Sequence, residues 1–355
     1  MPRLRDLGLA PGTLPPGEAN AVTDVPGVLV GQTTLVRGDS VRTGVTVILP
    51  RAEDPWAEPV FAGAHRLNGN GELTGLEWIR ESGLLSTPVA LTNTHSVGVV
   101  RDALVAWETG RREGVFWSLP VVGETWDGVL NDVNGMHVTK DDVVAALAAA
   151  ASGAVAEGNT GGGTGMICHG FKGGTGTSSR VVPAAAGGWT VGVLVQANHG
   201  RRKRLTVLGR PVGAAIAAEE VPMPGPPGRE GAGSIIVVVA TDAPLLPNQC
   251  ARLAQRAGLG VGRVGGVGEN SSGDLFLCFA TGNRGLPVNA VSGEHALTVE
   301  LTMLGNHALD PLFDAVVEAT EEAILNALLA AETMTGRGGA TAYALDPERL
   351  LRALA

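Results

Sequence analysis

Gly233 and Ser234 are the neighbouring residues whose types most directly suggest chemistry. A serine hydroxyl is a weak nucleophile until a nearby base takes its proton. If the peptide bond before Ser234 is cut, the new α-amine titrates at about 7.7–8.0 and can act as that base. The hydroxyl can make the cut by attacking the preceding carbonyl, in an N-to-O acyl shift. Glycine at position 233 would tolerate the strained backbone that such an attack needs.

The segments on either side of this pair fit a cleavage of that kind. Residues 221–233 are rich in proline and glycine, which excludes a helix or a central strand. Residues 234–240 form the strongest buried-strand signal in the sequence. A loop that solvent can reach, followed by a rigid strand, would hold the hydroxyl in place. The same layout is also typical of an ordinary loop entering an ordinary strand, so the layout alone leaves both interpretations open.

The elements that must position this pair are predicted from short apolar runs bounded by turn residues. We expect strands at 45–49, 89–91, 116–122, 189–196, 234–240 and 275–280. We expect helices from residue 139, where Thr139 can cap the first turn, and at about 246–257, 309–333 and 347–354. Residues 158–179 predict a glycine-rich loop region. Strands and helices are interspersed without regular βαβ spacing, which favours a layered α+β sandwich over a doubly wound sheet.

The composition is that of a folded globular protein, with 44% hydrophobic and 17% charged residues among 355. The formal net charge of −9 and the pI of about 5.3 argue against a surface for nucleic acids or anionic membranes. The basic cluster at 201–204 is therefore interpreted as a solvated turn. No apolar stretch approaches the roughly 20 residues of a membrane helix, and the N-terminus lacks a signal core.

The cysteines and histidines predict neither disulfides nor a metal centre. The three cysteines are widely spaced without a Cys-x-x-Cys pair, and the seven histidines include no His-x-x-x-His pair. We therefore expect no cofactor and a protein that is soluble in a reducing cytoplasm.

Several long stretches, in order along nearly the whole chain, resemble one family: the L-aminopeptidase/D-esterase-amidases and β-peptidyl aminopeptidases, or DmpA-like serine hydrolases. The matching stretches are RTGVTVILP at 42–50, GNGELTG at 69–75, NTHSVG at 93–98, VVGETWDGVLND at 121–132, GGGTGMICHGFKGGTGTSSR at 161–180, VGVLVQANHG at 191–200, GSIIVVVATDAPLLP at 233–247, SSGDLFLCFATGN at 271–283 and AAETMTGRGG at 330–339.

The resemblance implies a single hydrolase domain over 1–355 that is cut between Gly233 and Ser234. The products would be an α chain of 1–233 and a β chain of 234–355, with Ser234 as the nucleophile. The family fold is a four-layer αββα sandwich like that of N-terminal-nucleophile hydrolases and ornithine acetyltransferase. The family also assembles as homo-oligomers of αβ units, which implies a tetramer here.

The resemblance also assigns roles around Ser234. Asn198 falls on the family's oxyanion-hole amide, and an amide N–H suits a developing alkoxide. Ser272 and Asp274 fall on the family's second serine and acidic residue, where a carboxylate could order Ser272 and stabilise a protonated α-amine. Some members carry Glu at this acidic position, so Asp274 shortens that arm. Without the resemblance, Asn198 is a strand-end turn residue, and residues 271–274 are a polar turn.

Two further residues are implied to bind the substrate. Glu124 resembles the carboxylate that pairs with the substrate's free amine, which would make the enzyme exo-acting. Trp126 stands where we expect a tyrosine, and its indole N–H can donate a hydrogen bond but cannot transfer a proton as a phenol can. Taken alone, Glu124 is equally a surface glutamate.

These inferences predict a self-cleaving serine aminopeptidase that releases N-terminal amino acids from small peptides, amides or esters with a free amine. An endo-acting oligo-amide hydrolase of the same fold is an alternative, although those enzymes use threonine where this chain has Ser234. A non-catalytic glycine-rich binding protein is the second alternative. The sequence does not distinguish among L-α-, D-α- and β-aminoacyl substrates.

Overall fold

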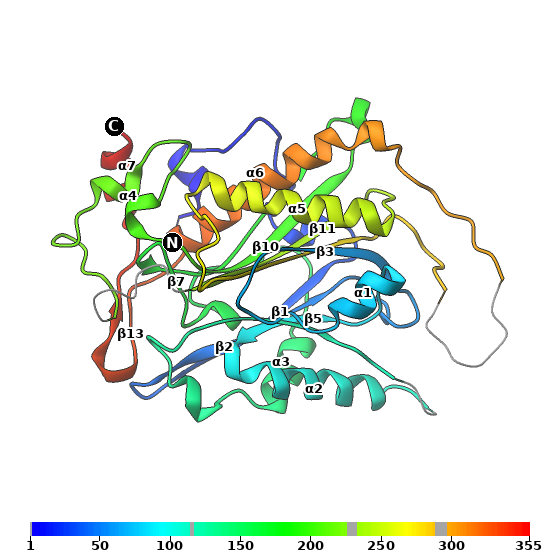
Figure 1. Ribbon diagram of the computed structural model, residues 1–355, viewed down its shortest axis with the longest axis horizontal. Coiled ribbons are helices and arrows are strands. Elements are labelled where there is room, and N and C mark those ends of the chain that lie inside the picture. Colours follow the sequence, from blue (N-terminus) through cyan, green and yellow to red (C-terminus); the bar gives the residue numbers. More distant parts are fainter. Residues whose placement is uncertain (1, 114–116, 226–232, 288–296) are drawn as a thin grey trace.

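The structure, a computed structural model, describes residues 2–113, 117–225, 233–287 and 297–355. Two β-sheets lie face to face and helices cover the outer face of each, which gives four layers (Figure 1). Helices α5 and α6 pack on the larger sheet, and α2 and α3 pack on the smaller one. The predicted αββα sandwich therefore describes the chain.

The smaller sheet has the strand order β1 (Leu29–Arg37), β2 (Val41–Leu49), β5 (Val89–Asn93), β6 (Val121–Thr125). The larger sheet has the order β4 (Leu84–Leu85), β3 (Val60–Gly69), β12 (Gly273–Ala280), β11 (Ser234–Thr241), β10 (Thr190–Asn198), β9 (Gly174–Val181). Two short hairpins are β7 (Ile167–Cys168) with β8 (Phe171–Lys172), and β13 (Met334–Thr335) with β14 (Thr341–Ala342). The helices are α1 (Leu76–Ser82), α2 (Val97–Thr109), α3 (Lys140–Ala148), α4 (Val212–Ala215), α5 (Pro247–Arg263), α6 (Asp310–Leu329) and α7 (Pro347–Leu354).

The central strand β11 explains why its sequence is continuously apolar. Ile235, Val237 and Val239 point to the core beneath α5 and α6, because successive strand side chains alternate between faces. Ile236 and Val238 point to the core between the two sheets. Every residue of the strand is buried. Two buried faces fix the register of β11, and thereby the position of its first residue, Ser234.

Most predicted elements are present, with shifted ends. The predicted strand at 116–122 instead begins at Val121, and its first residue, Phe116, lies outside the described residues. Thr139 does occupy the N-cap position of α3, in a capping box in which the Asp142 carboxylate accepts the Thr139 backbone N–H at 2.8 Å. Strands β1, β3 and β9 and helix α2 were not predicted. None of the helices within the described ranges has the length and hydropathy that a membrane crossing requires.

Two expectations are corrected. The glycine-rich region is not a loop to residue 179, because Gly174–Val181 is strand β9. A Cβ on Gly176 would lie 2.0 Å from the Ala323 carbonyl oxygen, so glycine lets α6 pack closely on this strand. The turn at 201–204 is not fully solvated either. Arg202 is buried, where its guanidinium donates to the carbonyls of Val221 and Gly170.

Candidate active site

The register of the larger sheet brings the predicted reactive residues together where three central strands begin or end. In the antiparallel pair β10–β11, Asn198 lies opposite Ser234. In the parallel pair β11–β12, Ile235 lies opposite Asp274, so Ser234 lies beside the start of β12. Three segments that are far apart in the sequence therefore meet at the first residue of the central strand.

Ser234 is held by a backbone donor that sequence reasoning missed. The Gly273 N–H donates to Ser234 Oγ at 3.0 Å, and the serine is only 5% exposed. A Cβ on Gly273 would lie 2.5 Å from the Asn70 carbonyl oxygen, so only glycine fits at this position without a shift. The bond orients the hydroxyl oxygen and would stabilise negative charge on it.

Gly233 lies against the backbone of Asn198. A Cβ at position 233 would come 1.8 Å from the Asn198 carbonyl oxygen and 3.3 Å from its side-chain Nδ2. The peptide bond between Gly233 and Ser234 is thus next to the predicted oxyanion donor. Glycine is therefore required at position 233 because a side chain would collide with the Asn198 backbone, in addition to the tolerance of backbone strain that the sequence suggested.

The side chain of Asn198 is fixed at both of its ends. Its Oδ1 accepts a hydrogen bond from the Ile167 N–H at 2.8 Å, and its Nδ2 donates to the Trp126 carbonyl at 2.9 Å. These bonds assign the amide orientation. Nδ2 carries a second hydrogen, and this nitrogen lies beside Gly233, where an added Cβ would be 3.3 Å away from it.

Ser272 and Asp274 form a buried pair behind the nucleophile. Ser272 Oγ donates to Asp274 Oδ1 at 2.5 Å, and both residues are almost fully buried. Burial raises the pKa of the Asp274 carboxyl to about 6, although the bond from Ser272 partly opposes the shift. The carboxylate is thus poised to change charge in a mildly acidic range.

Glu124 lies near the end of β6 with both carboxylate oxygens occupied. Oε1 accepts a hydrogen bond from the Glu72 N–H at 3.0 Å, and Oε2 accepts one from the Thr94 hydroxyl. The residue is 3% exposed, so it is not the surface glutamate of the alternative interpretation. Burial raises the pKa of its carboxyl. A substrate ammonium would compensate the buried charge.

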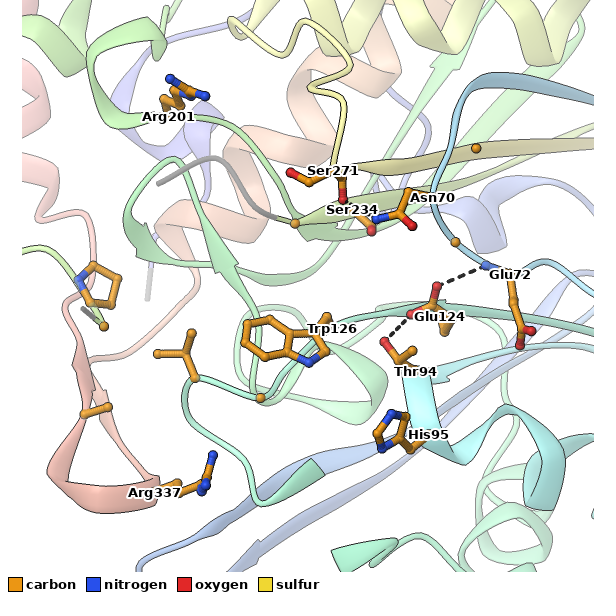
Figure 2. A pocket seen from close by; sticks show the side chains of 18 residues that line it. Asn70, Glu72, Thr94, His95, Glu124, Trp126, Arg201, Ser234, Ser271 and Arg337 are labelled. Atoms are coloured by element: carbon orange, nitrogen blue, oxygen red, sulfur yellow. Dashed lines mark hydrogen bonds between the residues drawn. The ribbon is translucent and has the colours of Figure 1, made fainter. Parts of the chain in front are cut away.

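A pocket of about 1300 Å³ connects these groups (Figure 2). Its wall includes Gly233, Ser234, Glu124 and Trp126, while Ser271 replaces the predicted Ser272 at the surface. Ser272, Asp274 and Asn198 do not line the pocket, but the pairing of β10 and β12 with β11 places them next to Ser234. The remaining lining residues are Gly69, Asn70, Gly71, Glu72, Thr94, His95, Gly128, Val129, Arg201, Pro224, Gly225, Arg337 and Ala340.

Comparison with known proteins decides the family. The profile of peptidase family S58 matches residues 20–342. This chain belongs to peptidase family S58. It is 48% identical to the beta-peptidyl aminopeptidase BapA of Sphingosinicella microcystinivorans, over 99% of this chain and 91% of that relative.

Solved structures give the same result for this S58 chain. A Burkholderia sp. beta-aminopeptidase superposes with a TM-score of 0.95 at 57% identity, covering 99% of this chain and 98% of the other. The L-aminopeptidase D-Ala-esterase/amidase of Ochrobactrum anthropi gives 0.90 at 46% identity, covering 100% and 98%, and is described as a variant of the Ntn hydrolase fold. The predicted family, the fold and the class, a serine aminopeptidase of the N-terminal-nucleophile type, are confirmed. The matches favour this class over both alternatives.

The fold of this S58 chain also gathers a thiol and two imidazoles that no sequence spacing suggested. One ligand atom each from Cys168, His169 and His199 lies within 4.8 Å of the others, and all three residues are buried. Lys172 Nζ is buried close by and donates to the carbonyls of Met166 and Gly173 at 2.9 and 2.8 Å. Burial lowers the pKa of Lys172 to about 7, and the charged form of this side chain would repel a metal cation bound here. His199 Nδ1 contacts the Cys168 thiol at 3.7 Å instead.

Proposed function

We propose that this S58 chain cleaves itself between Gly233 and Ser234, and that the mature enzyme removes N-terminal residues from short peptides, amides or esters with a free amine. The observation that carries the proposal is the placement of Ser234. It is the first residue of a rigid strand, its Oγ is held by an amide, and the preceding glycine lies against Asn198.

Cleavage begins with attack of Ser234 Oγ on the Gly233 carbonyl carbon. The second N–H of Asn198 Nδ2 donates to the oxygen that becomes negative in the tetrahedral intermediate. Breakage of the C–N bond gives an ester between Gly233 and Ser234 Oγ, and the hydroxyl proton passes to the departing nitrogen, which becomes the free α-amine. Water then hydrolyses the ester, which leaves a carboxylate on Gly233 and the free hydroxyl and amine on Ser234.

In the mature enzyme the α-amine of Ser234 takes the hydroxyl proton as Oγ attacks the substrate carbonyl. The leaving group takes that proton, and the aminoacyl group stays on Oγ as an ester until water releases it. Ionised Asp274, ordered by Ser272, stabilises the ammonium that forms in between. Asn198 serves both reactions, since each passes through an oxyanion beside the same nitrogen.

Glu124 selects substrates by their amine. The buried carboxylate attracts an ammonium strongly because little water screens it. It therefore pairs with the substrate N-terminus while Ser234 reaches the first carbonyl. Because several relatives are named as β-aminopeptidases, we propose β-aminoacyl groups as preferred substrates. Rates on matched β-, L-α- and D-α-aminoacyl p-nitroanilides test this preference.

Intact mass and N-terminal sequencing of the wild type and of Ser234→Ala test the self-cleavage. We expect two chains of 1–233 and 234–355 from the wild type and one whole chain from the variant. A wild-type protein that stays whole while hydrolysing aminoacyl amides would exclude the α-amine as the base. A cleaved protein without activity on any free-amine substrate would exclude the aminopeptidase.

We further propose that αβ units assemble as a homo-oligomer, a tetramer. Support comes from exposed apolar side chains along one segment, where Leu297 is fully exposed and Met303 is 54% exposed. Light scattering after size-exclusion chromatography measures the mass. We also propose a cytoplasmic location, supported by three buried cysteines that form no disulfide. Cell fractionation tests the location.

A further inference from the structure

The charges around the active-site pocket are divided between its two sides. Figure 2 shows the carboxylates of Glu124 and Glu72 on the right and the guanidinium groups of Arg201 and Arg337 on the left, with Ser234 and the Trp126 indole between the two sides. A short peptide has the same polarity, with an ammonium at one end and a carboxylate at the other. The proposed amine contact at Glu124 uses only half of this pattern.

The two arginines differ in their partners. Arg201 Nε lies 3.7 Å from the Glu269 carboxylate, which also pairs with Arg204 at 2.9 Å. Arg201 therefore has a carboxylate partner, but it shares the single negative charge of Glu269 with Arg204. Among the described residues, no carboxylate forms an ion pair with Arg337, whose side chain lines the pocket. A ligand anion in the pocket would therefore find in Arg337 a guanidinium group that pairs with none of the described carboxylates.

The backbone that carries Arg337 is fixed to the loop after β6. The Arg337 N–H donates to the Leu130 carbonyl at 2.8 Å. The neighbouring Gly336 packs so closely that a Cβ there would lie 2.0 Å from the same oxygen. The buried guanidinium of Arg42 donates through Nε to the Thr335 carbonyl at 2.9 Å and so ties down the β13–β14 hairpin.

The loop after β6 is itself held in one conformation. Buried Asp127 accepts a hydrogen bond from Asn131 Nδ2 at 3.0 Å, and Asn131 Oδ1 accepts the Arg42 N–H at 2.9 Å. Strand β6, which carries Glu124, leads directly into this loop. The distance between the proposed amine site and the Arg337 backbone is therefore set by a rigid connection, which a selection by substrate length requires.

From this geometry we infer that Arg337 binds the C-terminal carboxylate of the peptide substrate, so that the pocket recognises both ends of a short free peptide. The guanidinium would donate two parallel hydrogen bonds to the carboxylate, as its planar shape favours. The inference rests on the proposed function, because it assumes that Glu124 holds the amine. It makes Arg337 a determinant of specificity for unblocked peptides of one length.

The test is a series of peptides of two to five residues with one N-terminal residue that the enzyme accepts, each as the free acid and as the C-terminal amide. Release of the first residue gives kcat/KM for wild type, Arg337→Gln and Arg337→Lys. Arg201→Gln is the matched control. It also removes a cation from the pocket, but that cation has a carboxylate partner in the protein.

We expect the wild type to prefer the acid over the amide at one or two adjacent lengths. Because Arg337 is exposed, Arg337→Gln should lower kcat/KM for those acids by about twofold to fivefold through KM, and should change the amides by less. Arg337→Lys should keep part of the preference, and Arg201→Gln should keep more of it than Arg337→Gln does.

Two results would overturn the inference while the proposed function stands: an unchanged acid-to-amide ratio at every length in Arg337→Gln, or equal losses on acids and amides. The second result would mean that Arg337 only supports the hairpin. A wild type that cleaves none of these peptides would overturn the proposed function as well.

Discussion

Replacing Gly233 by alanine tests the proposed self-cleavage with a single added methyl group. The new Cβ would lie 1.8 Å from the Asn198 carbonyl oxygen, about 1.6 Å closer than ordinary van der Waals contact. Strand β10 cannot easily yield, because the Asn198 side chain is bonded to the Ile167 N–H and the Trp126 carbonyl. The scissile bond must therefore move away from the oxyanion donor.

The expected size of the effect follows from the overlap. Overpacking a closely packed site costs about 1–3 kcal/mol. If that cost falls on the transition state for the attack of Ser234 Oγ, cleavage slows by about fivefold to 150-fold. Misplacing reacting atoms by roughly 1 Å has effects of similar size.

The assay follows the fraction of two-chain protein over time after cell-free synthesis, by intact mass. Gly262→Ala is the control, since a Cβ there, on helix α5, meets nothing within 4 Å. Thermal unfolding of Gly233→Ala separates slow cleavage from failed folding. A folded Gly233→Ala protein that cleaves as fast as the wild type would refute the reasoning, because the close contact with Asn198 would then have no role.

Three further predictions concern buried charges. Glu124→Gln should lower kcat/KM by about tenfold to 100-fold on substrates with a free amine, and equal activity in a steady-state assay would exclude the amine contact. Because burial raises the pKa of Asp274 to about 6, its carboxylate is protonated as the pH falls through that value, so wild-type kcat/KM should fall there. Protonation of the Ser234 α-amine at about 7.7–8.0 also lowers the rate, so Asp274→Asn should be slower and should lose only the further fall near pH 6; an unchanged profile near pH 6 would assign that fall to another group. Burial lowers the pKa of Lys172 to about 7 from 10.5, so the unfolded chain binds more protons between these values and stability rises with pH across that window. Lys172→Met should lose this rise in its melting temperature; identical pH profiles would contradict the assignment.

The sequence was sufficient for the elements whose signal is local. Strand β11 was predicted because both of its faces are apolar, and Ser234 was singled out by the change from loop to strand. Strand β9 was missed because its residues are mostly Gly, Thr and Ser, and its burial depends on α6, which lies more than 100 residues later. Propensity cannot report a strand whose apolar surroundings come from another element.

In the candidate site, too, some residues could be predicted from the sequence and others could not. Family resemblance pointed to Asn198, Glu124 and Asp274, and the structure places them in one pocket or next to Ser234, which lines it. The Gly273 amide was missed since a backbone N–H leaves no mark in a sequence beyond the glycine that makes room for it. Arg337 was also missed, because whether an arginine has a carboxylate partner depends on which residues lie near it in the folded chain. The roles assigned to these residues remain predictions.

The order of strands in the larger sheet affects how the enzyme can unfold and refold after the proposed cut. Strands β3 and β10 precede the cut, and β12 and β11, which lie between them, follow it. Strands of the two products would therefore pair within one sheet, and the products could separate only if the hydrogen bonds between these strands were broken. Folding of the uncut chain is a reaction of one molecule, whereas separated products would have to associate, which depends on their concentration. Unfolding of the cleaved enzyme would then be difficult to reverse, so its lifetime would depend on the rate of unfolding and not on the equilibrium between folded and unfolded states.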